Sequence, residues 1–250
     1  MKSNILQVKN LTVELDNEKI INNLSFQVKK GEFLTILGPN GSGKTVLLRT
    51  LLGLIPKYTG EIIWQDNVKI GYLPQGLTHL KVKNLPLSVE EFLSLKKLKH
   101  NKIRKSLDFD GRWKSLDFDE KVELLKLVGI DNQNILKKKI GNLSGGQFQR
   151  MLMAWALSGN PDILLFDEPT VGVDVRGEKT IYRLLRKLQK EQNLTIILIT
   201  HDLNVVFKYS TDVLCVSKDN ICHATPKEVL FPEKLKEIYG MPIKFYKHNH

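Results

Sequence analysis

The sequence predicts an α/β fold built on a parallel sheet, and three apolar runs carry this prediction. Residues 163–166 and 195–199 have the length and composition of buried strands, and an amphipathic helix is expected between them over residues 178–192. A third run, 33–37, leads into a glycine-rich segment and then a helical pattern over 46–55. Strands that alternate with helices indicate βαβ units, and therefore a parallel sheet.

Two further regions surround or interrupt this core. Polar and apolar residues alternate over residues 5–36, with a turn signal at Asp16 and Asn17, which predicts antiparallel hairpin strands. Residues 88–129 have a helical period instead and predict a helical insertion. We expect one domain over residues 1–240, with a helical subdomain inserted at about 76–160, and a tail over 241–250.

Composition limits the classes of partner and location. Lys and Arg total 38 against 27 Asp and Glu, so the net charge of +11 favours anionic partners. Residues 96–114 hold eight basic and two acidic residues, a net of +6, which fits a solvated surface or a contact with anionic lipid or an acidic partner. No apolar run reaches the roughly 18 residues of a membrane span, and no signal-peptide core is present, so we expect a soluble, cytoplasmic chain.

The chain has two cysteines, Cys215 and Cys222, and His223 follows the second. Two cysteines do not indicate a disulfide framework, and a metal site needs three or four ligands at suitable spacing. We expect buried structural cysteines, with a thiol and imidazole metal site as the alternative.

A glycine-rich segment carries the strongest chemical signal. It matches G-x-x-x-x-G-K-[ST] in full, with the residues Gly38, Pro39, Asn40, Gly41, Ser42, Gly43, Lys44 and Thr45. Glycines let successive N–H groups point at a phosphate, and the following helix adds its positive N-terminal end. We expect Lys44 to reach the β- and γ-phosphates of a nucleotide and the Thr45 hydroxyl to ligate Mg²⁺. A glycine loop without a ligand is the alternative.

Two carboxylates follow the apolar run 163–166 and are expected at the carboxyl edge of the sheet, where α/β proteins bind ligands. Asp167 suits Mg²⁺ coordination, and Glu168 can polarise a water molecule for attack on the γ-phosphate. A turn or helix-capping role is the alternative.

Gln75 and His201 also follow predicted strands, at 70–73 and 195–199. A γ-phosphate sensor must lie at such strand ends, although ordinary polar residues also occur there. A role for these two residues can be inferred only together with the surrounding motifs.

The pentapeptide Leu143, Ser144, Gly145, Gly146 and Gln147 resembles the signature motif of ABC-type ATPases. The other motifs of that family match in the family's order: the phosphate loop 38–45, Gln75, the signature, the Walker B strand 163–168, the D-loop residue Asp174 and His201. The resemblance implies a P-loop NTPase core of the RecA-like type, with an N-terminal antiparallel β subdomain and a helical subdomain that carries the signature.

The resemblance also implies the cofactors and the site. Two copies stack head to tail as a homodimer, and each ATP lies between the phosphate loop of one copy and the signature of the other. The implied ATP-binding residues are those of the loop 38–45 with Val46 and Gln75, and, from the second copy, Ser144, Gly145, Gly146, Gln147 and Asp174. The implied Mg²⁺ ligands are Thr45, Gln75 and Asp167. The implied catalytic residues are Glu168 and His201.

Segments 168–177, 85–89 and 212–222 are similar to those of the ATP-binding subunits of zinc and manganese importers, especially zinc. This implies uptake of a divalent metal, integral-membrane permease subunits, an extracytoplasmic metal-binding protein, and a position at the cytoplasmic face of the inner membrane. Manganese or iron uptake is the nearer alternative. A soluble ABC ATPase acting on ribosomes or nucleic acid is the alternative of another class, but the chain lacks the second cassette or long coiled coil usual there, so we expect no nucleic-acid partner.

Three positions depart from the family pattern. Leu15 stands where an aromatic side chain normally stacks on adenine, a contact worth about 1–3 kcal/mol by analogy with nucleic-acid binders. Val46 replaces a hydroxyl residue and removes a hydrogen bond worth about 1 kcal/mol. Trp155 replaces an arginine. Leu15 and Val46 motivate a third hypothesis, a regulatory nucleotide-binding module with little turnover.

Overall fold

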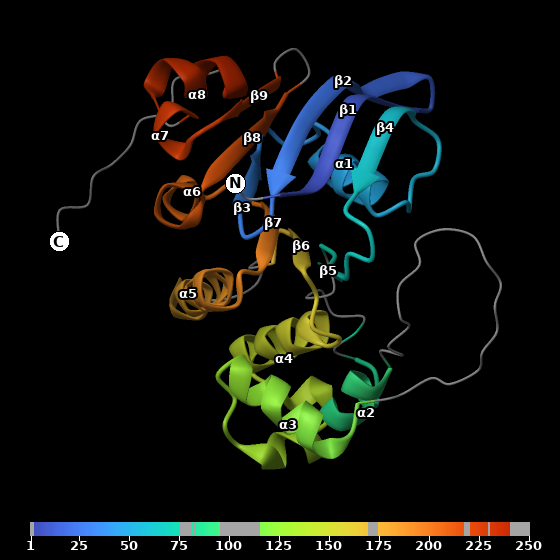
Figure 1. The fold of residues 1–250 in the computed structure, drawn as a ribbon. Helices are drawn as coiled ribbons and strands as arrows, with labels where there is room; N and C mark the ends of the chain where they lie inside the picture. The colour runs from blue at the N-terminus through green and yellow to red at the C-terminus, as the bar shows by residue number, and fades with distance from the viewer. Residues whose placement is uncertain are drawn as a thin grey trace. The chain divides into compact units, whose positions relative to one another are not determined.

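The computed structural model describes residues 3–75, 82, 84–95, 116–169, 175–217, 221–229 and 231–240 (Figure 1). The chain divides into two compact units, one formed by Met1–Gln65 with Thr195–His250 and the other by Asp66–Leu194. We call them the first and the second unit. The basic segment 96–114 and the predicted tail 241–250 lie outside the described residues.

The first unit contains an antiparallel sheet of three strands. The strands are β1 (Asn4–Leu15), β2 (Glu18–Lys29) and β4 (Thr59–Trp64), in the order β2-β1-β4. Asp16 and Asn17 join the first two strands with φ values of 51° and 64°, and two consecutive positive φ angles are typical of a tight hairpin turn. The predicted N-terminal antiparallel subdomain is therefore confirmed.

The first unit also holds four strands that pair in the order β7-β3-β8-β9. They are β3 (Phe33–Leu37), β7 (Thr195–Ile199), β8 (Asp212–Val216) and β9 (Ile221–Ala224). The strand β3 pairs in parallel with β7 and β8, whereas β9 pairs antiparallel with β8. Every residue of β3 and β7 is buried, as expected for parallel strands covered on both faces.

The described residues of this unit form four helices: α1 (Lys44–Leu51), α6 (Leu203–Tyr209), α7 (Pro226–Val229) and α8 (Pro232–Tyr239). The predicted helix 46–55 thus begins two residues earlier and ends four residues earlier. It ends because Gly53 has a φ of 71°, while the N–H of Leu54 donates to the carbonyl of Arg49 and that of Gly53 to Thr50. This pair of bonds is a Schellman motif, which terminates a helix.

The described residues of the second unit form two parallel strands, β5 (Ile70–Leu73) and β6 (Ile163–Asp167), and the remaining helical elements. Its helices are α2 (Val89–Ser94), α3 (Phe118–Leu127), α4 (Gly145–Leu157) and α5 (Val175–Gln192), with 3₁₀ turns at Gln133–Lys137 and Ile140–Asn142. The predicted helix 178–192 is confirmed but starts earlier, at Val175. Both α2 and α3 begin with capping boxes, which supply partners for otherwise unpaired N–H groups.

Gly71 in β5 allows close packing inside the second unit. A Cβ at this position would meet the Leu164 side chain and, at 2.6 Å, the backbone oxygen of Ala156. Strand β5 can therefore approach both its neighbour β6 and helix α4. Nearby, Lys121 of α3 is only 6% exposed and forms an ion pair of 3.4 Å with Glu90 of α2.

The two cysteines, expected as buried structural residues, form a disulfide that the sequence did not indicate, with Cys215 buried and Cys222 half-buried. Cys215 and Cys222 are directly opposite each other in the β8–β9 register, with their Cα atoms 4.9 Å apart, a separation that a disulfide spans. His223 lies on the other face of β9, since successive side chains alternate, and it pairs with Asp212 at 3.1 Å. The two thiols and this imidazole therefore do not converge on one metal ion.

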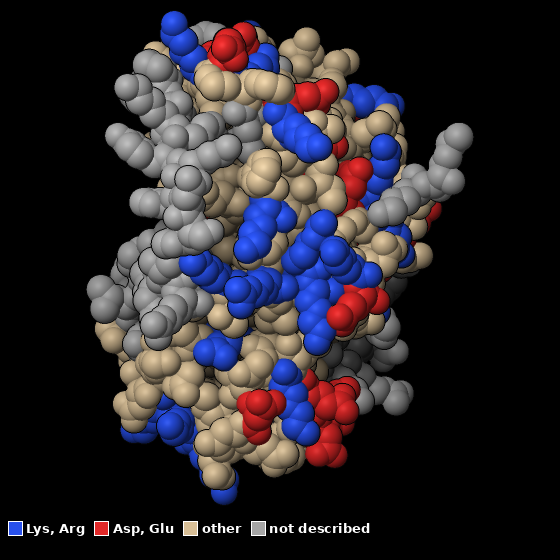
Figure 2. Space-filling view, turned by 90° about the vertical axis from the view of Figure 1, so that its left-hand side faces the viewer, with Lys and Arg blue, Asp and Glu red and all other residues tan. Residues whose placement is uncertain are grey.

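Basic side chains are spread beyond the segment 96–114. Figure 2 shows Lys and Arg side chains gathered on the face that it draws. The exposed residues Lys179, Arg183, Lys187 and Lys190 recur every three or four positions along α5 and so share one face of this helix. None of the helices within the described ranges has the length and apolar character needed to cross a membrane.

Candidate nucleotide-binding site

The glycine-rich loop joins the buried strand β3 to helix α1, which is the context that a phosphate loop requires. Gly38, Gly41 and Gly43 have positive φ values of 155°, 78° and 93°. A Cβ at Gly38 would collide with the backbone carbonyl of Val216, and one at Gly43 would meet the Ile20 side chain at 2.9 Å. The first and last of these glycines are therefore required by packing as well as by backbone conformation.

Polar groups of the loop are held inside it. Lys44 is only 7% exposed, and its Nζ donates to the carbonyl oxygens of Gly38 at 2.9 Å and Pro39 at 2.8 Å. Ser42 Oγ is buried and has no hydrogen-bond partner among the described residues. A buried hydroxyl without a partner calls for an explanation, and a bound phosphate oxygen would supply one. The loop thus has the donors that a polyphosphate needs.

The other predicted residues of the first unit lie at the ends of its elements. Thr45 stands in the first turn of α1 and is half-buried, as is Val46. His201 follows β7 after one intervening residue and is exposed. Leu15 is the last residue of β1 and is half-buried.

In the second unit the structure brings Gln75 and Glu168 together. Gln75 Nε2 donates to Glu168 Oε2 at 2.8 Å. Strands β5 and β6 run parallel, so the residues that follow them emerge at the same edge. Glu168 has a φ of 48°, a conformation that non-glycine residues rarely adopt and that is often retained at functional sites. The preceding residue, Asp167, ends β6 and is only 1% exposed.

The signature pentapeptide forms a helix N-terminus with a complete capping box. Ser144 Oγ accepts a bond from the Gln147 N–H at 3.2 Å, and Gln147 Oε1 accepts one from the Ser144 N–H at 3.2 Å. Helix α4 therefore begins at Gly145. Ser144 and Gly145 are exposed, so the positive end of α4 is open to an outside anion.

Gln149 and Arg150 of α4, which the sequence did not single out, connect the start of this helix to neighbouring segments. Gln149 is fully buried, and its Nε2 donates to the carbonyl of Pro169, the residue after Glu168. Arg150 donates from Nε to Gly146 at 3.2 Å and from Nη1 to Gly129 at 2.9 Å. The signal that could have indicated Gln149 is a polar residue at a helical spacing from apolar residues such as Leu152 and Met153.

Two further positions named from the sequence are Trp155 and Asp174. Trp155 of α4 packs on Phe92 of α2, with ring centroids 6.1 Å apart and planes inclined at 46°. The replacement of arginine thus adds an aromatic contact between the two helices. Asp174 lies outside the described residues.

Substituting Ser144 with alanine is expected to lower the free energy of unfolding by about 1 kcal/mol, since the Gln147 N–H loses its cap. Chemical denaturation measures this effect. Ser94→Ala is the matched control, because the Ser94 hydroxyl only bonds back to Glu90 within α2 and caps no helix. Equal losses in the two variants would show that the Ser144 cap does not contribute.

Known proteins with similar sequences identify the family of this chain. The family model described as ABC transporter matches residues 21–171. A probable metal transport system ATP-binding protein of Thermotoga maritima is 40% identical over 94% of this chain and 90% of its own length. The zinc import ATP-binding protein ZnuC of Wigglesworthia glossinidia brevipalpis is 34% identical over 99% of both chains.

Solved structures show the same fold. A metal-chelate type ABC transporter in an inward-facing conformation has a TM-score of 0.80 at 27% identity, covering 99% of this chain and 95% of its own. A dimeric ATP-binding cassette with bound ADP and Pi, in a post-hydrolysis state, has a TM-score of 0.67 at 28% identity, covering 88% and 98%. The chain therefore belongs to the ABC transporter family as an ATP-binding subunit, an ATPase coupled to transport.

Proposed function

We propose that this chain hydrolyses ATP to drive the uptake of a divalent metal ion, with zinc as the first candidate. The observation that carries the hydrolytic part is the hydrogen bond of 2.8 Å from Gln75 to the carboxylate of Glu168, a residue at a strand end whose backbone φ is 48°. Relatives described as zinc import ATP-binding proteins support the choice of zinc, since they match almost the whole chain at 34% identity. A metal transport relative at 40% identity leaves manganese and iron as alternatives.

We assign the binding of the ATP phosphates to the loop 38–45, with Val46 beside it. The evidence is local: Lys44 is held within the loop, and the Ser42 hydroxyl is buried without a described partner. Lys44 would neutralise charge on the β- and γ-phosphates. Thr45, Gln75 and Asp167 offer oxygen donors, the type that Mg²⁺ prefers, and Mg²⁺ would neutralise phosphate charge when bound.

We assign the water-activating step to Glu168. Its carboxylate can accept a proton from water as the oxygen attacks the γ-phosphate, and Gln75 holds one carboxylate oxygen in place. His201 is assigned to contact with the γ-phosphate, because it follows a parallel strand at its carboxyl end.

We propose that the working form is a homodimer in which Ser144, Gly145, Gly146, Gln147 and Asp174 of one copy complete the ATP site of the other. Support comes from the exposed N-terminus of α4, which presents N–H groups to an anion outside its own unit. The related cassette with bound ADP and Pi is dimeric. Loss of the γ-phosphate would remove the link between the two copies and let them separate.

The proposed partners are integral-membrane permease subunits, which would place the chain at the inner face of the membrane, and, indirectly, an extracytoplasmic metal-binding protein. Affinity capture of a tagged chain from detergent-solubilised membranes is expected to recover an integral-membrane partner. Recovery of ribosomes or nucleic acid instead would favour the other class of ABC ATPase.

Metal choice needs a separate measurement. Cells with the chain deleted are expected to accumulate zinc more slowly, and a Lys44→Ala copy should not restore uptake because it lacks the phosphate-binding ammonium. Wild-type protein supplies the positive control. Normal zinc uptake with impaired manganese or iron uptake would transfer the proposal to that metal.

A further inference from the structure

The disulfide joins the edge of the sheet to its interior. Cys222 lies on β9, the edge strand of four residues, and Cys215 lies on β8, directly opposite. Cys215 is only 1% exposed, whereas Cys222 is half-buried and accessible in part. A small thiol can therefore approach the sulfur of Cys222 more readily than that of Cys215.

The disulfide is connected to the phosphate loop in two ways, by strand pairing and by packing in an apolar cluster. Cys215 is the register partner of Leu37, the residue before Gly38. The next residue of β8, Val216, places its carbonyl oxygen where a Cβ of Gly38 would lie. The end of β8 thus packs directly against the first turn of the loop.

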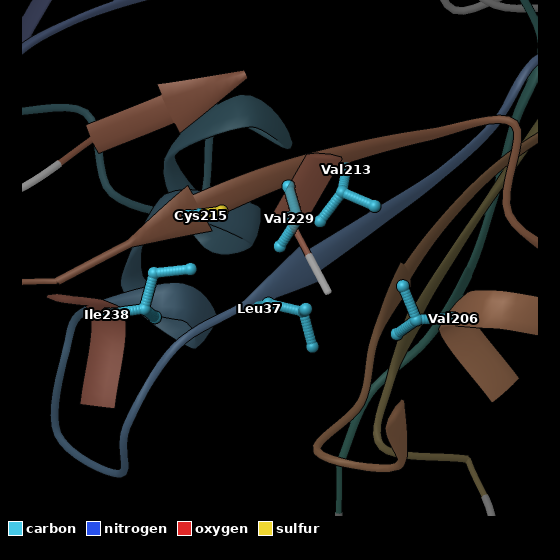
Figure 3. Packing of buried hydrophobic residues seen from close by; sticks show 6 residues of the cluster. All are labelled: Leu37, Val206, Val213, Cys215, Val229 and Ile238. Carbon is cyan, nitrogen blue, oxygen red and sulfur yellow. The ribbon is translucent and has the colours of Figure 1, made fainter. Parts of the chain in front are cut away.

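A second path runs through the C-terminal helices. Figure 3 shows Leu37 and Cys215 in one apolar cluster with Val206, Val213, Val229 and Ile238, and Cys222 and Tyr239 pack against its edge. Helices α7 and α8, which follow β9 in the chain, therefore pack on the same cluster as Leu37, the residue before Gly38.

We propose that Cys215 and Cys222 form a thiol–disulfide switch that sets the nucleotide affinity of the loop 38–45. With the disulfide closed, β9 is tied to β8, so the cluster that contains Leu37 keeps its packing. With the disulfide open, β9 keeps its strand pairing and the ion pair of His223 with Asp212, but the covalent tie to β8 is lost beside the residues that pack against the loop. The inference rests on the assignment of ATP to this loop.

The chemistry is thiol–disulfide exchange with a small thiol such as glutathione. A glutathione thiolate attacks Cys222 Sγ, the bond between the two cysteine sulfurs breaks, and Cys215 leaves as a thiolate that takes up a proton. A second glutathione thiolate attacks the mixed disulfide and releases Cys222 as a thiol after protonation. The protein disulfide is reduced to two thiols, and two glutathione molecules are oxidised to one glutathione disulfide.

The test is titration of the full chain with Mg²⁺-ADP after equilibration in glutathione disulfide or in reduced glutathione, with the thiol state of each sample counted by mass spectrometry. We expect the Kd of the reduced protein to be about fivefold higher, at the lower limit of typical couplings between sites. Cys222→Ser is expected to bind with the weaker affinity in both buffers. Cys222→Ala should behave in the same way, which separates loss of the bond from any effect of the serine hydroxyl.

Equal affinities in the two thiol states of the wild-type chain would overturn the switch, as would two free thiols persisting in glutathione disulfide. Failure of the proposed function has a different signature, because ADP would then bind in neither buffer to a folded chain. A redox response that survives in Cys222→Ser would also contradict the assignment to this pair.

Discussion

Replacing Glu168 with glutamine is expected to lower the rate of ATP hydrolysis by about 10²–10⁴-fold, while ATP still binds. The amide keeps the size of the side chain and an oxygen that can accept the bond from Gln75 Nε2. It cannot take a proton from the attacking water. Because Glu168 already has a φ of 48° in the wild-type chain, the change removes a charge without a new demand on the backbone.

The measurement is phosphate release by the transport complex in membranes, with binding of a fluorescent ATP analogue followed in parallel. Glu123→Gln is the matched control, since Glu123 is exposed on α3 in the same unit and should leave both quantities unchanged. Undiminished turnover in Glu168→Gln would remove Glu168 from the catalytic step. A wild-type rate no higher than that of the variant would instead favour the regulatory module with little turnover.

The sequence predicted those elements whose signals are local. Residues 195–199 form a buried strand as predicted, because a continuous apolar run bounded by polar residues fits a strand covered on both faces. The same reasoning located the residues after β5 and β6, and the structure places Gln75 and Glu168 in contact there. Helix ends were less accurate, because caps depend on side-chain bonds such as that between Ser144 and Gln147.

Features that depend on strand order were not predictable. Alternation tells which face a side chain occupies, but not which residue of another strand lies opposite. The Cys215–Cys222 disulfide required the register of β8 against β9, and two cysteines seven residues apart carry no such information. The bond from buried Gln149 to Pro169 likewise joins segments twenty residues apart, and it depends on the packing of α4.

Replacing Gly38 with alanine is expected to weaken nucleotide binding about a hundredfold, which corresponds to about 3 kcal/mol, the upper part of the range for a strained backbone site. The new Cβ would collide with the carbonyl oxygen of Val216 and would come within 2.8 Å of Ser42 Oγ. Val216 is the last residue of β8, and its backbone is held by pairing with Ile221 in β9. The loop must therefore move, and its N–H groups lose their alignment toward the phosphates.

Gly53→Ala isolates the backbone contribution from the collision. Gly53 has a φ of 71°, but a Cβ there would meet no atom within 4 Å. It should therefore lower the free energy of unfolding by about 1 kcal/mol through its conformation alone, without changing nucleotide affinity. Titration with Mg²⁺-ADP and chemical denaturation of both variants give the two quantities separately. If Gly38→Ala bound ADP as tightly as Gly53→Ala, the loop would tolerate displacement at Gly38, and its contact with β8 would not determine the geometry of phosphate binding.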